Sequence, residues 1–174
     1  MEFMPLRMEK EYLLSVTAKN HTGVLLRIAG LFSRRCYNIS SIVAAQSEDS
    51  ETSRLIIVVK GDDKIVRQVE KQLCKLCDVE QVMVLNSEEA VVREYLLIRV
   101  MHSEETNAQL VAIANVFHAD MLHVSEKAMV LELAGSAATL NSFVEILKPY
   151  GIEKILRTGA MAMTIEERNE EKSC

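Results

Sequence analysis

The stretch that decides the fold is TAKNHTGVLLRIAGLFSRRCYNISSI, residues 17–42. It begins at the end of an alternating apolar segment and passes through four small or polar residues, Asn20 to Gly23. Apolar side chains then recur at helical spacing, at Leu25, Ile28, Ala29 and Phe32. The stretch therefore predicts a strand, a tight turn and an amphipathic helix. It also raises the question of why a glycine stands where the helix begins.

The first half of the chain extends this unit into a complete small domain. The segment SRLIIVVK is β-branched and apolar on both faces, which predicts a central strand. The expected elements are strands at 11–19, 38–47, 53–60 and 79–85, a helix from Val24, and a second helix capped by Asp62 or Asp63 and marked by Ile65, Val69, Leu73 and Leu76. The order β-α-β-β-α-β is the ferredoxin-like split βαβ pattern.

The second half repeats the same order with different residues. Its expected strands are 93–101, 120–125, 128–134 and 152–159, and its helices are 104–118 and the stripe from Leu140 to Leu147 that Pro149 and Gly151 end. The sequence thus predicts the α+β class, with two ferredoxin-like domains at 11–86 and 91–165. Each should have an antiparallel sheet with helices on one face. Residues 1–10 and 166–174 are expected to be flexible termini.

Composition excludes several classes of protein. Of the 174 residues 49% are hydrophobic and 26% are charged, which is ordinary for a globular protein. No apolar run approaches the roughly 18 to 20 residues of a membrane span. The net charge of −5 argues against a nucleic-acid partner. The N-terminus has no secretory pattern, so we expect a cytoplasmic protein whose four cysteines are free thiols.

The turn from Asn20 to Gly23 allows two interpretations. A helix N-terminus has free N–H groups and a partial positive charge, which suits a carboxylate, and glycine allows close approach to the backbone. An asparagine side chain offers both a donor and an acceptor, which suits the two ends of an amino acid. In the alternative, Thr22 is an N-cap beside Gly23 and the turn only starts a helix. The residues alone leave both interpretations open.

Other candidate sites are weaker. The CKLC motif of Cys74 and Cys77 has redox or zinc-knuckle spacing, but it falls in the expected second helix without a matching pair. We expect both thiols to be reduced and to bind no metal, and we take Cys36 and Cys174 to be isolated. The histidines His102, His118 and His123 are not at i, i+4 on a helix, so we expect no metal site.

Motifs of catalysis are not found. There is no nucleophile elbow, P-loop or Rossmann fingerprint, so we expect no catalytic residues and a binding module rather than an enzyme. RNA-binding modules share the β-α-β-β-α-β order. Their aromatic central strand is missing here, because SRLIIVVKG contains no aromatic residue.

The opening stretch resembles the ACT domain of regulatory (small) subunits of acetohydroxyacid synthase, also called acetolactate synthase. The family pattern is N-x-x-G, then R-x-x-G-L-F-x-x-R, then Y-N-I. The chain has Asn20-His21-Thr22-Gly23, then Arg27, Gly30-Leu31-Phe32 and Arg35, then Tyr37-Asn38-Ile39. The resemblance continues through SRLIIVVKGDDKIVRQVEKQLCKLCDVEQVMVL and, more loosely, through VREYLLIRV and LELAGSAATLNSFVEIL. It covers roughly residues 11 to 165.

The resemblance implies a regulatory role. Such subunits have no active site and no cofactor. They bind the catalytic (large) subunit, which uses thiamine diphosphate, Mg and FAD, raise its activity, and confer feedback inhibition by a branched-chain amino acid, usually valine. Their ACT domains pair, and effector lies at the pairing interface. The effector-binding residues implied are Asn20, His21, Thr22, Gly23 and Val24 of one chain with Asn38 and Ile39 of the partner.

Two positions depart from the family pattern. Lys19 stands where an acidic residue is common, and Cys36 stands where glycine usually ends the first helix, a position that favours a left-handed backbone. A free-standing ACT-type amino-acid sensor with another partner is the alternative function. In either case we expect a dimer or a larger oligomer, because a lone four-stranded sheet leaves its edges unpaired.

Overall fold

A computed structural model describes residues 10–86, 88–165 and 174. Their contacts divide the chain into two compact units. The first is Met1–Val91 with Ala162–Cys174, and the second is Val92–Met161. Residues 162–165, which we expected in the second domain, are grouped with the first. Of the termini expected to be flexible, Lys10 lies in a strand, and residues 1–9 and 166–173 lie outside the described residues.

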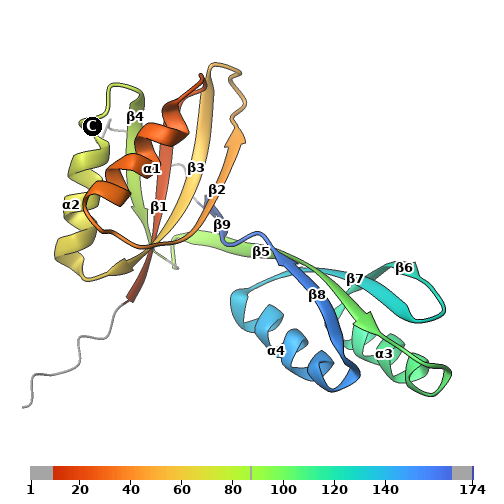
Figure 1. The fold of residues 1–174 in the computed structure, drawn as a ribbon. Coiled ribbons are helices and arrows are strands. Elements are labelled where there is room, and N and C mark those ends of the chain that lie inside the picture. The colour runs from red at the N-terminus through yellow and green to blue at the C-terminus, as the bar shows by residue number, and fades with distance from the viewer. Residues whose placement is uncertain (1–9, 87, 166–173) are drawn as a thin grey trace, which may run out of the picture. The chain divides into compact units, whose positions relative to one another are not determined.

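The first unit has the predicted β-α-β-β-α-β order. Its elements are β1 (Lys10–Lys19), α1 (Val24–Arg34), β2 (Ile39–Gln46), β3 (Thr52–Gly61), α2 (Asp63–Leu73) and β4 (Val79–Leu85). The sheet order is β2-β3-β1-β4, and all the paired strands are antiparallel. Figure 1 shows α1 and α2 on one face of this sheet. The predicted fold class is therefore confirmed for this unit.

The core of the first unit follows the apolar patterns of the sequence. Alternate residues of β1, Leu14, Val16 and Ala18, are buried against the helical stripe that includes Ile28 and Phe32. In β3 every residue from Leu55 to Val59 is buried, as expected for a strand that lies between β2 and β1. Burial of apolar surface stabilises a fold by about 25 cal/mol per Å², so β3, which is apolar and buried on both faces, contributes strongly to the stability of this unit.

Helix α2 begins where predicted but ends earlier. The Asp62 carboxylate accepts a hydrogen bond from the Ile65 N–H at 2.9 Å, which confirms the predicted N-cap. The helix ends at Leu73, and Cys74 is its C-cap. The CKLC motif therefore lies in the turn between α2 and β4, and our placement of it inside the helix was wrong.

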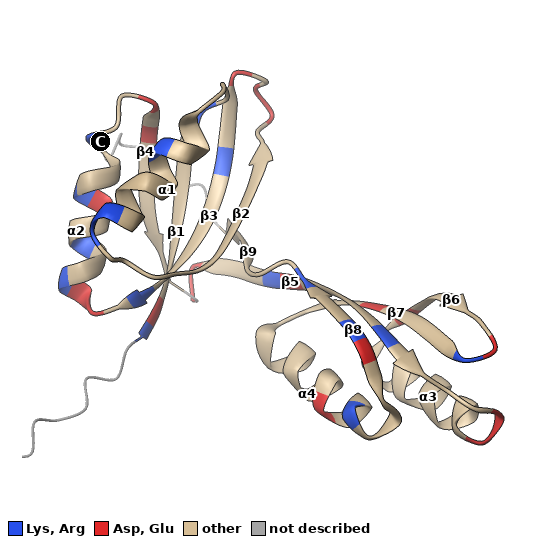
Figure 2. Cartoon of the chain, viewed as in Figure 1, with Lys and Arg blue, Asp and Glu red and all other residues tan. Residues whose placement is uncertain are grey.

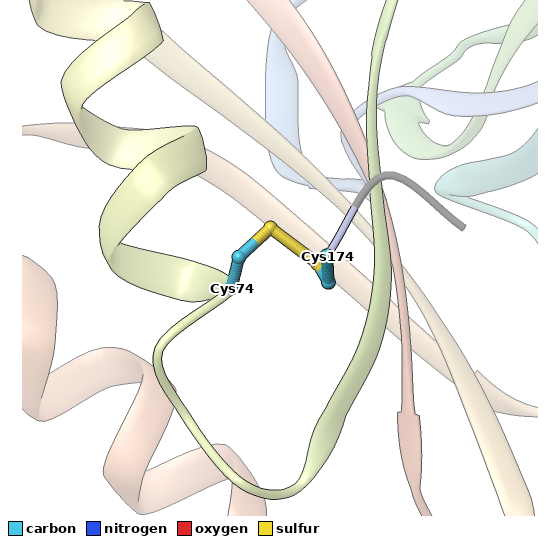
Figure 3. The surroundings of a disulfide bond; sticks show 2 residues. All are labelled: Cys74 and Cys174. Carbon is cyan, nitrogen blue, oxygen red and sulfur yellow. A yellow bond between two sulfur atoms is a disulfide. The ribbon is translucent and has the colours of Figure 1, made fainter. Parts of the chain in front are cut away.

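Two of the cysteines are joined. Cys74 and Cys174 form a disulfide with a Cα–Cα distance of 4.9 Å, although 100 residues separate them (Figure 3). The expectation that Cys74 is a reduced thiol and Cys174 an isolated one is therefore wrong. This pairing could not be predicted from the sequence, because two cysteines 100 residues apart leave no local pattern. Cys36 and Cys77 are free and exposed.

The turn after α1 keeps the backbone that glycine would favour. Cys36 has φ 56°, in the left-handed region, and its N–H bonds to the Ser33 carbonyl oxygen at 3.2 Å. A side chain in this region costs about 1–2 kcal/mol. The departure from the family pattern at Cys36 therefore strains the turn without changing its path.

The second unit repeats the topology of the first. Its elements are β5 (Ala90–Met101), α3 (Glu104–Phe117), β6 (Asp120–Val124), β7 (Ala128–Gly135), α4 (Ala137–Leu147), a 3-10 turn η1 (Lys148–Tyr150) and β8 (Ile152–Arg157). The first two residues of β5 are grouped with the first unit, as is the last strand, β9 (Met161–Thr164), from Ala162 on. The order β6-β7-β5-β8 matches that of the first sheet, and β9, which we did not predict, also pairs with β5. Helices α3 and α4 lie on one face (Figure 1).

Helix lengths carry one further finding. No helix within residues 10–86 and 88–165 is long and apolar enough to cross a membrane.

Candidate functional site

The turn between β1 and α1 is tied down by the two loops beside it. The N–H of Lys19 donates to the Asp78 carbonyl oxygen at 2.8 Å, and the N–H of Asn20 donates to the Glu51 carbonyl oxygen at 2.7 Å. Asp78 precedes β4, and Glu51 lies in the β2–β3 loop. Since β4 and β3 flank β1 in the sheet, this turn is held from both sides.

Helix α1 begins without a side-chain cap. Gly23 is the N-cap residue, with φ 92° and ψ −10°, and no side chain bonds to the first turn. Thr22 is thus not the N-cap, which removes the specific form of the alternative interpretation. Helices α2 and α4, in contrast, are capped by Asp62 and Ser136. Figure 2 shows basic but no acidic residues on α1, so no carboxylate of the helix itself offsets the partial positive charge of its N-terminus. The Val24 N–H makes only a long backbone hydrogen bond, 3.4 Å from the His21 carbonyl oxygen.

The side chain of Asn20 is held in place by a hydrogen bond to the β2–β3 loop. Asn20 Nδ2 donates to the Ser50 carbonyl oxygen at 2.9 Å, and the residue is exposed. This bond uses one of the two N–H donors of the amide, so Asn20 offers the Oδ1 acceptor and one further donor to a ligand. An acceptor in the turn that precedes a helix without a side-chain cap suits a molecule with one ammonium and one carboxylate.

A buried carboxylate supports the turn from behind. Asp78 is 6% exposed, and its Oδ1 lies 3.0 Å from His21 Nε2. Its Oδ2 lies 3.0 Å from Arg27 Nη1, near enough for an ion pair, although no N–H aligns with it as a hydrogen bond. His21 and Arg27 are about half exposed. Sequence reasoning missed Asp78, because it lies 57 residues from His21 and no local pattern links them.

The other predicted effector-binding residues, Asn38 and Ile39, lie far from the Asn20–Gly23 turn of the same chain. Lys19 pairs with Thr52 at one end of β3, whereas Ile39 pairs with Val59 seven residues along. At about 3.3 Å per residue these positions are roughly 23 Å apart. Asn38 is one residue further out still, since its carbonyl oxygen accepts from the Lys60 N–H. One copy of the chain therefore cannot bring both predicted groups to the same small ligand.

The described residues offer no sign of catalysis or metal binding. Within residues 10–86, 88–165 and 174, no three His, Cys, Asp or Glu side chains group so as to hold a metal ion. His21 and Asp78 pair in the manner of a base and its orienting acid, but the other ring nitrogen of His21 lies 3.1 Å from the Thr22 carbonyl oxygen, which is not a nucleophile.

Comparison with known proteins agrees with this architecture. Residues 14–81 match the family described as the AHAS small subunit-like ACT domain, and residues 93–166 match the small subunit of acetolactate synthase. The chain is similar to a protein of Archaeoglobus fulgidus named "Probable acetolactate synthase small subunit", with 39% identity over 88% of this chain and 96% of that one. It is 37% identical to the acetolactate synthase small subunit of Bacillus subtilis, over 86% of this chain and 88% of that one.

A solved structure extends the match to three dimensions. The crystal structure of the acetolactate synthase small subunit from Thermotoga maritima is 36% identical, with a TM-score of 0.85 over 91% of this chain and 99% of that one. Both domains and their order are thus shared with these relatives. The chain belongs to the family of acetolactate synthase small subunits.

Proposed function

We propose that this chain is a regulatory subunit that activates an acetolactate synthase catalytic subunit and makes it sensitive to a branched-chain amino acid, with valine the first candidate. Family membership supports the regulatory role. In this proposal the chain works in the cytoplasm and contributes no cofactor. Thiamine diphosphate, Mg and FAD would belong to the catalytic partner.

The observation that carries the effector proposal is the uncapped start of α1. Gly23 gives α1 no side-chain cap, and Asn20, whose amide nitrogen donates to Ser50, offers its Oδ1 acceptor from the same turn. The effector carboxylate would accept from the Gly23 N–H and from the Val24 N–H, in place of the long 3.4 Å bond of Val24 to the His21 carbonyl oxygen. The effector ammonium would donate to Asn20. His21 and Thr22 complete the turn. An amino acid with an apolar side chain suits a site whose neighbours on α1 include the exposed Leu26.

The separation of the two predicted groups supports a site built from two copies. Asn38 and Ile39 lie too far from Asn20 to share a ligand within one chain. Leu25 and Leu26 are 51% and 77% exposed on α1, and Ile42 is exposed on the edge strand β2. Pairing of two first domains would cover such apolar surface and the open strand edge. Each effector would then contact the Asn20 turn of one copy and Asn38 of the other.

The test is an acetolactate assay of the catalytic subunit with and without this chain, across added valine, leucine and isoleucine. We expect the chain to raise the rate, and at least one of the three amino acids to lower it again only when the chain is present. An unchanged rate on adding the chain would contradict the regulatory role. Activation that none of the amino acids reverses would contradict the effector site alone.

A further inference from the structure

Asp78 and Arg27 form an ion pair in which the carboxylate is buried and the guanidinium is about half exposed. Asp78 lies behind the turn with a side chain that is 9% exposed, whereas the Arg27 side chain is 48% exposed. A ligand that approaches the start of α1 therefore meets the positive end of the pair first. Charges near a protein surface are screened less when they are partly buried, so this arrangement favours an anion.

The orientation of Arg27 places this positive end at the glycine of the turn. One guanidinium nitrogen, Nη1, lies 3.0 Å from Asp78 Oδ2. The other, Nη2, lies 3.8 Å from the position that a Cβ on Gly23 would occupy. The space beside Gly23 that the effector carboxylate would use is thus bordered by guanidinium N–H groups as well as by backbone N–H groups.

We propose that Arg27 binds the effector carboxylate and that Asp78 is its positioning residue. This inference rests on the effector site proposed above and deepens it, because it names the side chain that distinguishes an amino acid from derivatives without the carboxylate. Guanidinium is a planar donor that matches carboxylate geometry. The buried Asp78 holds it by charge on one side and leaves the other side to the ligand. His21, which also bonds to Asp78, fixes the carboxylate itself.

The first test compares valine with valinamide, which keeps the ammonium and side chain but has no carboxylate. The assay is reconstituted activity with the catalytic subunit. In Arg27→Gln we expect the valine concentration for half-inhibition to rise about tenfold or more, the cost of one hydrogen bond between charged groups. The valinamide concentration for half-inhibition should change by no more than about twofold in the same variant. Arg27→Lys, which keeps the charge, should recover part of the response to valine.

The matched control is Arg34→Gln, which removes the same charge from the last turn of the same helix. It should leave inhibition by both compounds unchanged. Equal losses for valine and valinamide in Arg27→Gln, or inhibition by valine at the wild-type concentration, would overturn the role of Arg27. If the wild-type chain conferred no inhibition by any branched-chain amino acid, the effector site itself would be overturned and Arg27 with it.

The second test isolates Asp78. Asp78→Asn keeps an acceptor for His21 but removes the charge that holds Arg27, so the valine concentration for half-inhibition should rise severalfold. In an Arg27→Gln background the same change should have little further effect, since coupled residues are not additive. Additive effects, or no effect of Asp78→Asn alone, would show that Asp78 does not act through Arg27. Glu80→Gln, an exposed carboxylate two residues on, is the control.

Discussion

The substitution Gly23→Asp tests the turn most severely. Gly23 has φ 92°, where a side chain costs about 1–2 kcal/mol of folding free energy. Steric crowding adds little, because the nearest atom to a Cβ built at Gly23 is Arg27 Nη2 at 3.8 Å, an ordinary contact. Gly23→Ala carries the same backbone strain without a charge, so it is the matched control. The difference between the two variants measures the charge.

The effect on inhibition can be estimated from the same geometry. An aspartate carboxylate at this position lies beside the Arg27 guanidinium and the uncapped N–H groups of α1. It would occupy the place proposed for the effector carboxylate. Loss of one charge-assisted hydrogen bond costs about 1.5–3 kcal/mol, roughly tenfold to over a hundredfold in affinity. Gly23→Ala, which only adds bulk and strain, should lose less.

The assay reconstitutes each variant with the catalytic subunit and titrates valine, while urea unfolding reports whether the domain still folds. We expect Gly23→Asp to activate as the wild type does and to be inhibited only at much higher valine, with Asn20→Ala behaving in the same way more mildly. Wild-type inhibition curves for both variants would move the effector site elsewhere. Equal loss of activation and inhibition in a folded variant would mean that the turn only starts a helix.

Three further outcomes follow from the structure. Cys36→Gly should raise the free energy of unfolding by about 1 kcal/mol, because it relieves a left-handed backbone; urea unfolding checks this, and an equal gain from Cys36→Ala would refute it. Breaking the Cys74–Cys174 disulfide should lower stability by at most about 4–5 kcal/mol, the chain-entropy value for a loop of this length; thiol labelling of the unreduced protein should modify two cysteines, and labelling of all four would contradict it. A hydrogen bond to Asp63 raises the pKa of Tyr12. The stability that this bond contributes is present below about pH 10 and is lost as pH rises through the pKa of Tyr12 in the folded protein. Asp63→Asn should lower this pKa in an absorbance titration, and an unchanged titration curve would refute the assignment.

Much of the fold could be predicted because its signals are local. The alternation of β1 and the helical stripe of α1 each reflect one buried face, and the doubly apolar segment 53–60 identified the central strand. The strand β9 was missed because its four residues, MAMT, have no flanking pattern and gain their hydrogen bonds only by pairing with β5. Helix α2 ended early for a related reason. Leu76 fits the helical stripe but packs against the core from the following turn.

The site could be predicted only in part. The turn residues Asn20 and Gly23 are adjacent in sequence, so their role can be read from a short motif. Asp78 could not be predicted, since its contacts to His21 and Arg27 exist only once β4 lies beside β1. The disulfide between Cys74 and Cys174 was missed in the same way. Contacts of long sequence separation depend on tertiary structure, and no local pattern records them.

An effector site shared between two copies is tested most directly by complementation between two variants that are each weakly inhibited by valine. Asn20→Ala and Asn38→Ala are each reconstituted with the catalytic subunit, alone and after the two variants are mixed and allowed to exchange. A mixed dimer contains one site with both asparagines and one with neither. We expect each variant alone to respond weakly to valine and the mixture to recover part of the wild-type inhibition. A mixture no more sensitive than the better single variant, although mixed dimers have formed, would contradict a site built from two chains.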